Sequence, residues 1–396
     1  MTHNHAHKIG LATATIVGMN AMIGAGIFTA PSAMASKVGP AGILAYLFVV
    51  VSVWFMGISI ARAAELFPQE GSFYAYIKPL AGPAVGMLAN ASHLLGIVVA
   101  MGLLTQNAGA YLHTFIPTIE PMMLGLMVLG ALIALNIFGV MLSAVGQRVL
   151  IACTLFPLIT IILICLAHTN SSNFVEFAPY GMRNVLAATR IVIFGFFGFE
   201  CASLMYNSVK DPAKNVPRAL TYAIGIVGSL YLLFVASLIA AVPLLLFENP
   251  NYPLLTDVLR VRFPGDSFIL GAVHLSILSA MLGTVHSMIW STSASLSTLV
   301  SLAGNYAKRC WCLTQQQCVP IIGTFILLTF ALLKNQGLFF GFTALFMVSA
   351  YIGTMLTLLS IKEEWTSGRN IRTLIGLATA CTIMYFSIEL ILSSLV

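Results

Sequence analysis

Long apolar stretches follow one another along almost the whole chain, with short polar connections between them. A helix needs about 20 apolar residues to cross the hydrocarbon core of a bilayer. Eleven stretches approach this length, so the pattern predicts an all-helical, polytopic membrane protein with about 11 transmembrane helices. The expected spans are 9–36, 41–63, 83–113, 121–142, 148–168, 185–208, 217–245, 266–302, 319–333, 337–361 and 371–396.

Two of these spans are interrupted by glycine. The first contains Gly18-Met-Asn-Ala-Met-Ile-Gly-Ala-Gly-Ile-Phe28, and the sixth contains Phe194-Gly-Phe-Phe-Gly-Phe-Glu200. Every backbone amide in hydrocarbon must be satisfied within the protein, so unwound helix is expected only where it lines a cavity or holds a ligand. Paired broken helices in corresponding places of two halves are typical of the binding site of a secondary transporter. The interruptions therefore predict that helices 1 and 6 are broken around a substrate site.

The two breaks also indicate how the chain is organised. Each break opens a series of five spans, which predicts inverted repeats at about 9–168 and 185–361, with an extra helix at 371–396. Direct similarity between the two halves is weak, so this prediction rests on the matching breaks. Because the connections are short, we expect residues 1–396 to form a single transmembrane domain.

Composition excludes an ordinary soluble protein. Only 8% of the residues are charged and the mean hydropathy is +0.97, whereas about 25% of the residues in a soluble domain are charged. A net charge of +6 would suit a polyanionic partner, but its distribution indicates a topology instead. With a cytoplasmic N-terminus, twelve of the 18 Lys and Arg residues fall on the inner side, in agreement with the positive-inside rule. We therefore expect a multi-pass protein of the cell (inner) membrane with a cytoplasmic N-terminus and no nucleic acid partner.

The cysteine and histidine residues do not form a convincing metal site. Cys310, Cys312 and Cys318 lie in a predicted cytoplasmic loop, where thiols stay reduced, and a metal would want a fourth ligand at suitable spacing. The N-terminal tract with His3, His5 and His7 is typical of a polar tail. We predict neither a metal nor a cofactor.

Three blocks of sequence carry a family resemblance. They are Gly24-Ala-Gly-Ile-Phe28, then Gly71-Ser-Phe-Tyr-Ala-Tyr76 with Gly82-Pro83, and finally Phe194 to Ser203 followed by Val209 to Arg218. In this order and spacing they resemble the amino acid–polyamine–organocation (APC) superfamily, in particular bacterial basic amino acid/polyamine antiporters and permeases. The resemblance runs from about residue 7 to 390. It implies the inverted-repeat fold of sodium-coupled amino acid transporters, with five plus five helices and a site near the bilayer midplane.

The resemblance also raises the question of assembly. Relatives usually have twelve spans, and the eleven spans expected here place the C-terminus outside. In relatives the last spans often carry the contact between two copies. A homodimer is therefore an open alternative for this chain.

The family pattern implies a role for each break in holding an amino acid, whose charged groups are costly to desolvate. Free backbone amides at the first break would bind the carboxylate, helped by the positive end of the following half-helix. Carbonyls at the second break would bind the ammonium group. The alternative is that Gly24 and Gly26 only let helices pack closely. The implied binding residues are Ile23, Gly24, Ala25, Gly26, Ile27, Phe194, Gly195 and Phe197.

Further side chains are candidates around this site. Phe194 falls where relatives place an aromatic gate over the substrate, the alternative being simple packing. Met288 and Trp290 in the eighth span are weaker candidates for lining the pocket, and core packing explains them equally well. We expect His93 and His286 to be neutral core histidines, although serines near His286 leave a cation or substrate contact open.

Glu200 is the leading candidate for coupling transport to protons. Of the twelve acidic residues, only Glu200 and Glu389 lie well inside spans. Burial of a carboxyl group favours its protonated form, and relatives carry an acid at this position that is implicated in pH dependence. The alternative is a neutral carboxyl bonded to backbone. Thr154 stands where some relatives have a lysine in place of a sodium ion, which leaves exchange, coupling through Glu200, or a sodium ion.

These observations favour a secondary amino acid transporter that works by alternating access, with exchange of one amino acid or amine for another implied by the resemblance. Proton- or sodium-coupled symport is an alternative, and so is a non-transporting sensor of the same fold. An intramembrane enzyme is disfavoured because the aspartates lie in loops or at a span end. His286 and Ser287 are adjacent on a helix and point about 100° apart, so they cannot form a catalytic dyad.

Overall fold

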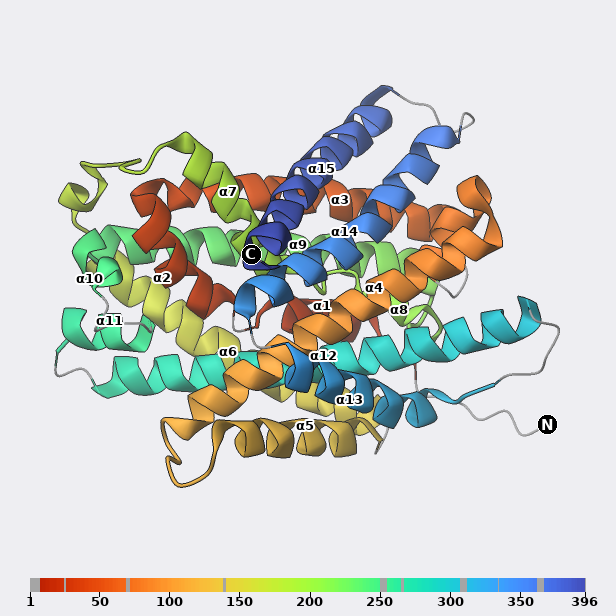
Figure 1. The fold of residues 1–396 in the computed structure, drawn as a ribbon, viewed down its shortest axis with the longest axis horizontal. Helices are drawn as coiled ribbons and strands as arrows, with labels where there is room; N and C mark the ends of the chain where they lie inside the picture. The colour runs from red at the N-terminus through yellow and green to blue at the C-terminus, as the bar shows by residue number, and fades with distance from the viewer. Residues whose placement is uncertain are drawn as a thin grey trace.

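The computed structural model describes residues 8–24, 26–68, 72–137, 140–249, 255–264, 267–306, 312–333, 335–361 and 367–395. Nearly all of these residues are helical, as the sequence predicts. In Figure 1 the long helices α3 (Gly42–Leu66), α6 (Val140–Ala167), α9 (Pro212–Ala241) and α12 (Ser267–Tyr306) run along the long axis of the molecule, and the short helices α10 (Leu244–Glu248) and α11 (Leu255–Arg262) lie at one end.

The first half of the chain opens with two short helices where one span is expected, and it continues with long helices. Within α4, Gly82 has φ +83°, so the helix bends there and Pro83 begins a new segment. The elements are α1 (Leu11–Met22), α2 (Gly26–Val38), the 3₁₀ turn η1 (Gly39–Ala41), α3 (Gly42–Leu66), α4 (Phe73–His113), α5 (Pro121–Ile137), α6 (Val140–Ala167) and the 3₁₀ turn η2 (Ser171–Phe174).

The second half also opens with a broken helix. Its elements are α7 (Met182–Val192), the 3₁₀ turn η3 (Ile193–Phe196), α8 (Cys201–Leu204), the 3₁₀ turn η4 (Tyr206–Ser208), α9 (Pro212–Ala241), α10 (Leu244–Glu248), α11 (Leu255–Arg262), α12 (Ser267–Tyr306), α13 (Gln315–Leu332), α14 (Gln336–Ser360) and α15 (Ser367–Leu395).

The expected fold class is confirmed. Every predicted span coincides with a helix or a broken pair of helices in the described parts of the chain. Eight of these helices are long and apolar enough to cross a membrane, and α1 and α5 are apolar but shorter. One boundary differs clearly, because α6 begins at Val140 rather than near residue 148. Asn20 donates from Nδ2 to Oε1 of the buried Gln147 at 2.6 Å, which lets this polar side chain lie within the helix.

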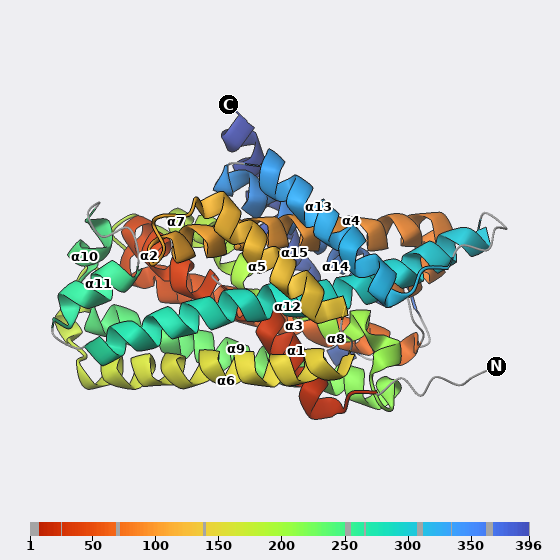
Figure 2. The same cartoon turned by 90° about the horizontal axis from the view of Figure 1, so that it is seen from below.

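The first break lies inside the molecule. α1 packs against α6, α9 and α12, and Figure 2 shows it among these helices. The outer helices expose large apolar side chains instead. On α6 these are Val145, Val149, Phe156 and Leu163, which recur at helical spacing and form one exposed face. Such a continuous apolar face is expected where a helix meets lipid.

A short backbone pairing joins the two halves near the N-terminus. The Ile9 N–H donates to the Ser208 carbonyl at 2.8 Å, and the Lys210 N–H donates to the Ile9 carbonyl at 2.8 Å. This parallel bridge between Ile9 and Val209 holds the start of α1 against the segment that leads into α9.

Candidate functional site

The first helix ends and restarts at the predicted place. α1 stops at Met22, and the Gly24 N–H donates to the Met22 carbonyl at 2.9 Å in a tight turn. α2 then begins at Gly26. Ala25, one of the predicted binding residues, lies outside the described residues.

The second break is a longer interruption. After α7 the chain passes through η3, becomes extended at Phe197 (φ −62°, ψ 141°), and turns at Gly198 with φ +105°. A Cβ atom at Gly198 would lie only 2.8 Å from the carbonyl oxygen of Ala21. Both the torsion and this close approach to α1 require glycine.

The two breaks touch each other. A Cβ at Gly26 would lie 3.0 Å from the Cα of Gly195, so the backbones of the two halves meet there without intervening side chains. The hydroxyl of Tyr231, fully buried on α9, lies 2.9 Å from the Met22 carbonyl and 3.0 Å from the Gly195 carbonyl. One hydroxyl therefore contacts a backbone carbonyl at each of the two breaks. Sequence reasoning missed Tyr231, although a tyrosine within an apolar span needs a partner for its hydroxyl.

α12 completes the surroundings of the first break. The Thr284 hydroxyl donates to the Asn20 carbonyl at 2.7 Å. A Cβ at Gly24 would lie 2.8 Å from the hydroxyl oxygen of Thr284. Met288 follows Thr284 by about one turn, so it shares the face that meets α1. Trp290 is buried two positions further along α12, and its carbonyl accepts a hydrogen bond from Gln315 of α13 at 3.0 Å. Both residues stay predictions as lining of the pocket.

Phe194 sits beside aromatic side chains from another part of the chain. Its ring is 8% exposed and meets Phe340 of α14 edge to face, with 4.8 Å between centroids. The ring of Phe197 also meets the Phe194 ring edge to face, with 6.5 Å between centroids. Phe194 therefore packs against α14, a contact that no sequence motif indicated.

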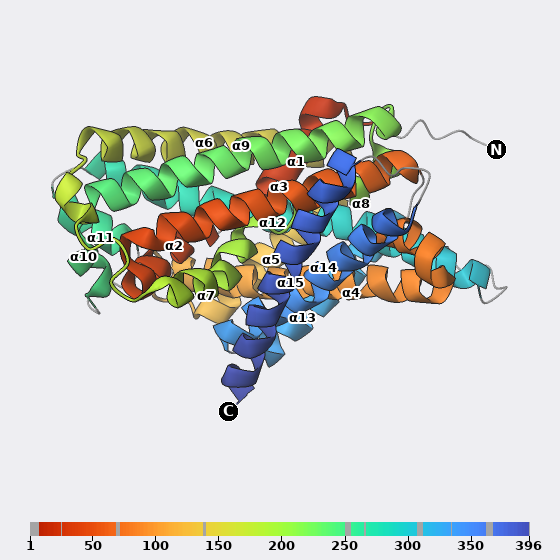
Figure 3. The same ribbon diagram turned by 90° about the horizontal axis from the view of Figure 1, so that it is seen from above.

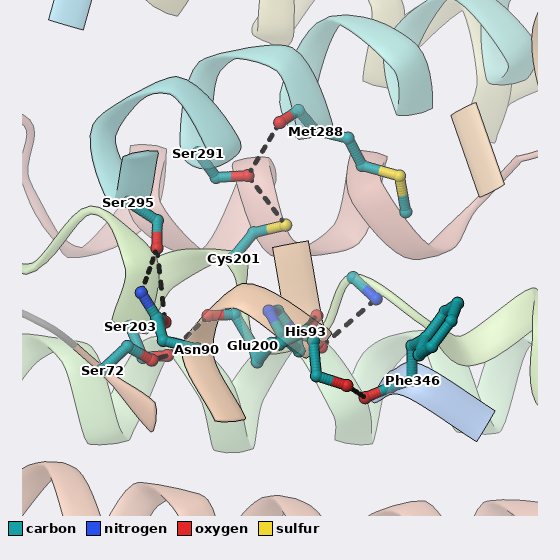
Figure 4. A network of polar contacts seen from close by, with 12 residues as sticks. Ser72, Asn90, His93, Glu200, Cys201, Ser203, Met288, Ser291, Ser295 and Phe346 are labelled. Carbon is teal, nitrogen blue, oxygen red and sulfur yellow. Dashed lines mark hydrogen bonds and ion pairs between the residues drawn. The ribbon is translucent and has the colours of Figure 1, made fainter. Parts of the chain in front are cut away.

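Glu200 is paired with a histidine from the first half. Its Oε1 lies 2.9 Å from Nε2 of His93 on α4, and both side chains are completely buried (Figure 4). The other carboxylate oxygen accepts a hydrogen bond from the Gly198 N–H at 3.3 Å. His93 is enclosed by Phe73, at 4.3 Å between centroids, and by Tyr351, at 6.0 Å. The pair therefore joins the second break to α4.

The other polar candidates are engaged in contacts between helices. Nδ2 of Asn136 on α5 lies 2.8 Å from Nδ1 of His286, and the Ser287 hydroxyl donates to Oε1 of Gln147 at 2.7 Å. His286 and Ser287 thus face different helices. Thr154 bonds to the Ser279 hydroxyl at 2.9 Å. Three or more metal-ligating side chains do not gather anywhere in the part of the chain that the structure describes, and Cys310 and the histidines of the N-terminal tract lie outside it.

Together, the long apolar helices and the two touching breaks define a multi-pass membrane protein built around a central helix-break site. Residues 9–388 match the amino acid permease family, so the chain belongs to that family. Uncharacterized transporter Rv1999c of Mycobacterium tuberculosis is 26% identical over 291 residues, which cover 72% of this chain and 64% of the relative. Branched-chain amino acid permease BcaP of Bacillus subtilis is 20% identical over 294 residues, which cover 69% of this chain and 63% of the relative. The chain thus matches just under two thirds of the length of these relatives.

A solved structure shows the same fold. MhsT, crystallised in complex with L-phenylalanine, aligns with 98% of this chain and 99% of its own length at a TM-score of 0.67. The two sequences are 12% identical. The likeness therefore concerns the arrangement of the helices. The bounds of the two inverted repeats, 9–168 and 185–361, stay a prediction.

Proposed function

We propose that this protein is a secondary transporter of amino acids that works by alternating access. The observation that carries the proposal is the contact between the two breaks, where one hydroxyl, that of Tyr231, serves carbonyls from both. Paired breaks of this kind bring backbone groups that are outside regular helix together inside a membrane protein, which is typical of the binding site of a secondary transporter. The family of the chain, and the amino acid named with BcaP and MhsT, support an amino acid as that ligand.

The substrate would lie across the two breaks. Amides from Ile23 to Ile27 would bind its carboxylate, which requires the Ile23 and Gly24 N–H groups to leave the Met19 and Met22 carbonyls. The carbonyls of Phe194, Gly195 and Phe197 would bind its ammonium group. Phe194 would close over the substrate against Phe340. Of the two acidic residues well inside spans, Glu200 already has a partner in His93. Because its carboxylate is engaged in this way, a substrate with a neutral side chain is favoured over one with a cationic side chain.

We propose exchange of one amino acid or amine for another as the mode of transport, in the cell (inner) membrane and with a cytoplasmic N-terminus. Proton-coupled symport is the second candidate, favoured by the buried pair of His93 and Glu200. A carboxylate and an imidazole can pass one proton between them, and movement of the second break would change their separation. Glu200 is in either case the candidate proton site.

Uptake of radiolabelled amino acids into liposomes containing the purified chain tests these proposals. The vesicles are preloaded with buffer or with unlabelled amino acids, and pH and sodium gradients are imposed separately; empty liposomes are the control. Uptake only into preloaded vesicles would establish exchange, whereas uptake driven by a proton gradient into unloaded vesicles would establish symport. Binding without flux under every condition would contradict transport and indicate a sensor.

A further inference from the structure

A basic cleft lies between α3, α9 and α15, away from the helix breaks. It encloses about 430 Å³, a volume within the usual range of small-molecule sites. Arg218 precedes Tyr231 by 13 positions on α9, which places the cleft roughly 20 Å along that helix from the breaks. In Figure 3 the first turns of α15 lie beside α3 and α9. The charged side chains that line the cleft are Arg62, Glu65, Arg218, Arg369 and Arg372.

The described lining of the cleft has a strong positive charge. Four arginines and one glutamate, Glu65, are the charged residues of this lining, and their net charge is +3. The planar guanidinium group matches the oxygens of a phosphate group and binds them with paired hydrogen bonds. The cleft thus has the charge and the donors for a phosphate ester.

The position of α15 adds to this field. The helix begins at Ser367, so Arg369 and Arg372 lie in its first two turns. The first N–H groups of a helix lack intrahelical acceptors and carry its positive end. Two of the arginines therefore stand at the end of the helix that itself favours an anion.

The surface beside the cleft is apolar and exposed. Tyr222 is 51% exposed, and Ile226 follows it one turn later on α9 with 47% exposure. Trp54 of α3 lies against this part of α9, 3.3 Å from where a Cβ of Gly225 would be, and Leu374 is exposed on α15. Tyrosine and tryptophan next to aliphatic side chains are typical of the membrane interface. A ligand with a phosphate head and hydrocarbon tails would fit both surfaces at once.

The geometry points to a site for the headgroup of an anionic phospholipid in this cleft, with its acyl chains along α9 and α3. The ends of the three helices that form the cleft lie on the predicted cytoplasmic side, where anionic lipids attract basic pockets between transmembrane helices. Because it depends on neither the substrate nor the mode of transport, this inference stands apart from the proposed function.

Lipid binding to the full-length chain in detergent tests the inference. Phosphatidylglycerol or phosphatidylcholine is titrated, and bound lipid is counted by native mass spectrometry. We expect phosphatidylglycerol to bind preferentially and the double variant Arg218→Gln/Arg372→Gln to bind it about thirtyfold more weakly, since each arginine contributes about fivefold. Glu65→Gln should bind it more tightly, because it removes the one carboxylate of the described lining. Arg260→Gln, an exposed arginine on α11, is the matched control and should bind as the wild type does.

Two results would overturn the assignment. One is equal binding of the two lipids by the wild type, and the other is undiminished phosphatidylglycerol binding by the double variant. Inorganic phosphate and glycerol 3-phosphate form a further arm of the experiment. If they bind at the cleft while the chain shows no preference between the lipids, the site belongs to a soluble phosphate ester and the lipid assignment is wrong. Gel filtration of each variant shows that it is folded, and the gain expected for Glu65→Gln cannot result from misfolding.

Discussion

At the scale of single residues, Tyr231 shows how much a buried hydroxyl can organise. It is the only donor in the described contacts that reaches carbonyls of both breaks, at Met22 and Gly195. The Met22 carbonyl also accepts from the Gly24 N–H, so the cost of a buried carbonyl left without a donor, about 1–3 kcal/mol, applies at most to Gly195. The side chain therefore stabilises the second break directly and holds it against the first.

Replacement of Tyr231 by Phe removes this donor and keeps the ring. We expect a loss of about 1–3 kcal/mol in the free energy of unfolding, together with reduced uptake, because the breaks lose a shared anchor. Thermal unfolding in detergent and uptake into liposomes measure the two effects. Tyr385→Phe, at a tyrosine that is 64% exposed on α15, is the control; equal behaviour of the two variants would contradict the role of Tyr231.

Gly198 is a second residue that the break cannot do without. Alanine there must adopt φ +105° and place its Cβ 2.8 Å from the Ala21 carbonyl oxygen. A strained backbone position of this kind costs about 1–3 kcal/mol before the clash is counted. We therefore expect Gly198→Ala to destabilise the protein by several kcal/mol or to abolish its expression. Gly130 on α5 has open space around it, and Gly130→Ala should be neutral or stabilise by up to about 1 kcal/mol. Chemical denaturation compares the two variants.

Glu200→Gln tests the proton site. The variant keeps the shape of the side chain but cannot ionise, so proton-driven uptake should be lost while exchange between preloaded amino acids continues. Glu389→Gln is the matched control, because Glu389 is the other acidic residue well inside a span and makes only a partly exposed ion pair with Arg183 at 3.8 Å. An unchanged response of Glu200→Gln to a pH gradient would show that the coupling proton lies elsewhere.

Much of this site could be predicted from the sequence, but the side chains that contact its residues from other helices could not. Glycine spacing indicated both breaks, and Glu200 stood out as an acid within an apolar span. Its pairing with His93, and the contacts of Phe194 with Phe340, join residues far apart in the chain. Such contacts depend on which helix faces come together, and the local pattern of a single sequence does not predict that pairing.

At the scale of elements, the pairing of Ile9 with Ser208 and Lys210 ties the start of α1 to the approach to α9. It is the one isolated bridge among the described residues. Apolar periodicity did not indicate it, because it depends on backbone groups rather than side chains.

Ile9→Pro removes the N–H that donates to Ser208. Loss of a hydrogen bond worth about 1 kcal/mol should speed amide exchange in residues 8–24 and 208–210 by about five- to tenfold. Hydrogen–deuterium exchange measured by mass spectrometry reports these segments. Ile9→Val keeps the donor and serves as control; wild-type exchange rates in the proline variant would show that the bridge does not hold α1.

At the scale of the whole molecule, orientation in the membrane follows from charge rather than from packing. The positive-inside distribution predicts that the loop with Cys312 faces the cytoplasm. A variant that retains only Cys312, an exposed cysteine, should resist a membrane-impermeant maleimide in intact cells and react after permeabilisation. A variant that retains only the exposed Cys381 of α15 controls for access to a position within a span. Labelling of Cys312 in intact cells would reverse the predicted topology.

The sequence by itself determined the class of the molecule, because apolar length decides which segments can cross a bilayer and glycine decides where a helix can open. A single sequence therefore predicted the two breaks and the helical architecture, and it contained the blocks that indicate the family. Only the tertiary structure decided that the breaks touch, that Tyr231 serves both, that Glu200 pairs with His93, and that four arginines from three helices share one cleft. These features depend on distances between segments remote in sequence, which are set by how helices pack and not by the composition of any one of them.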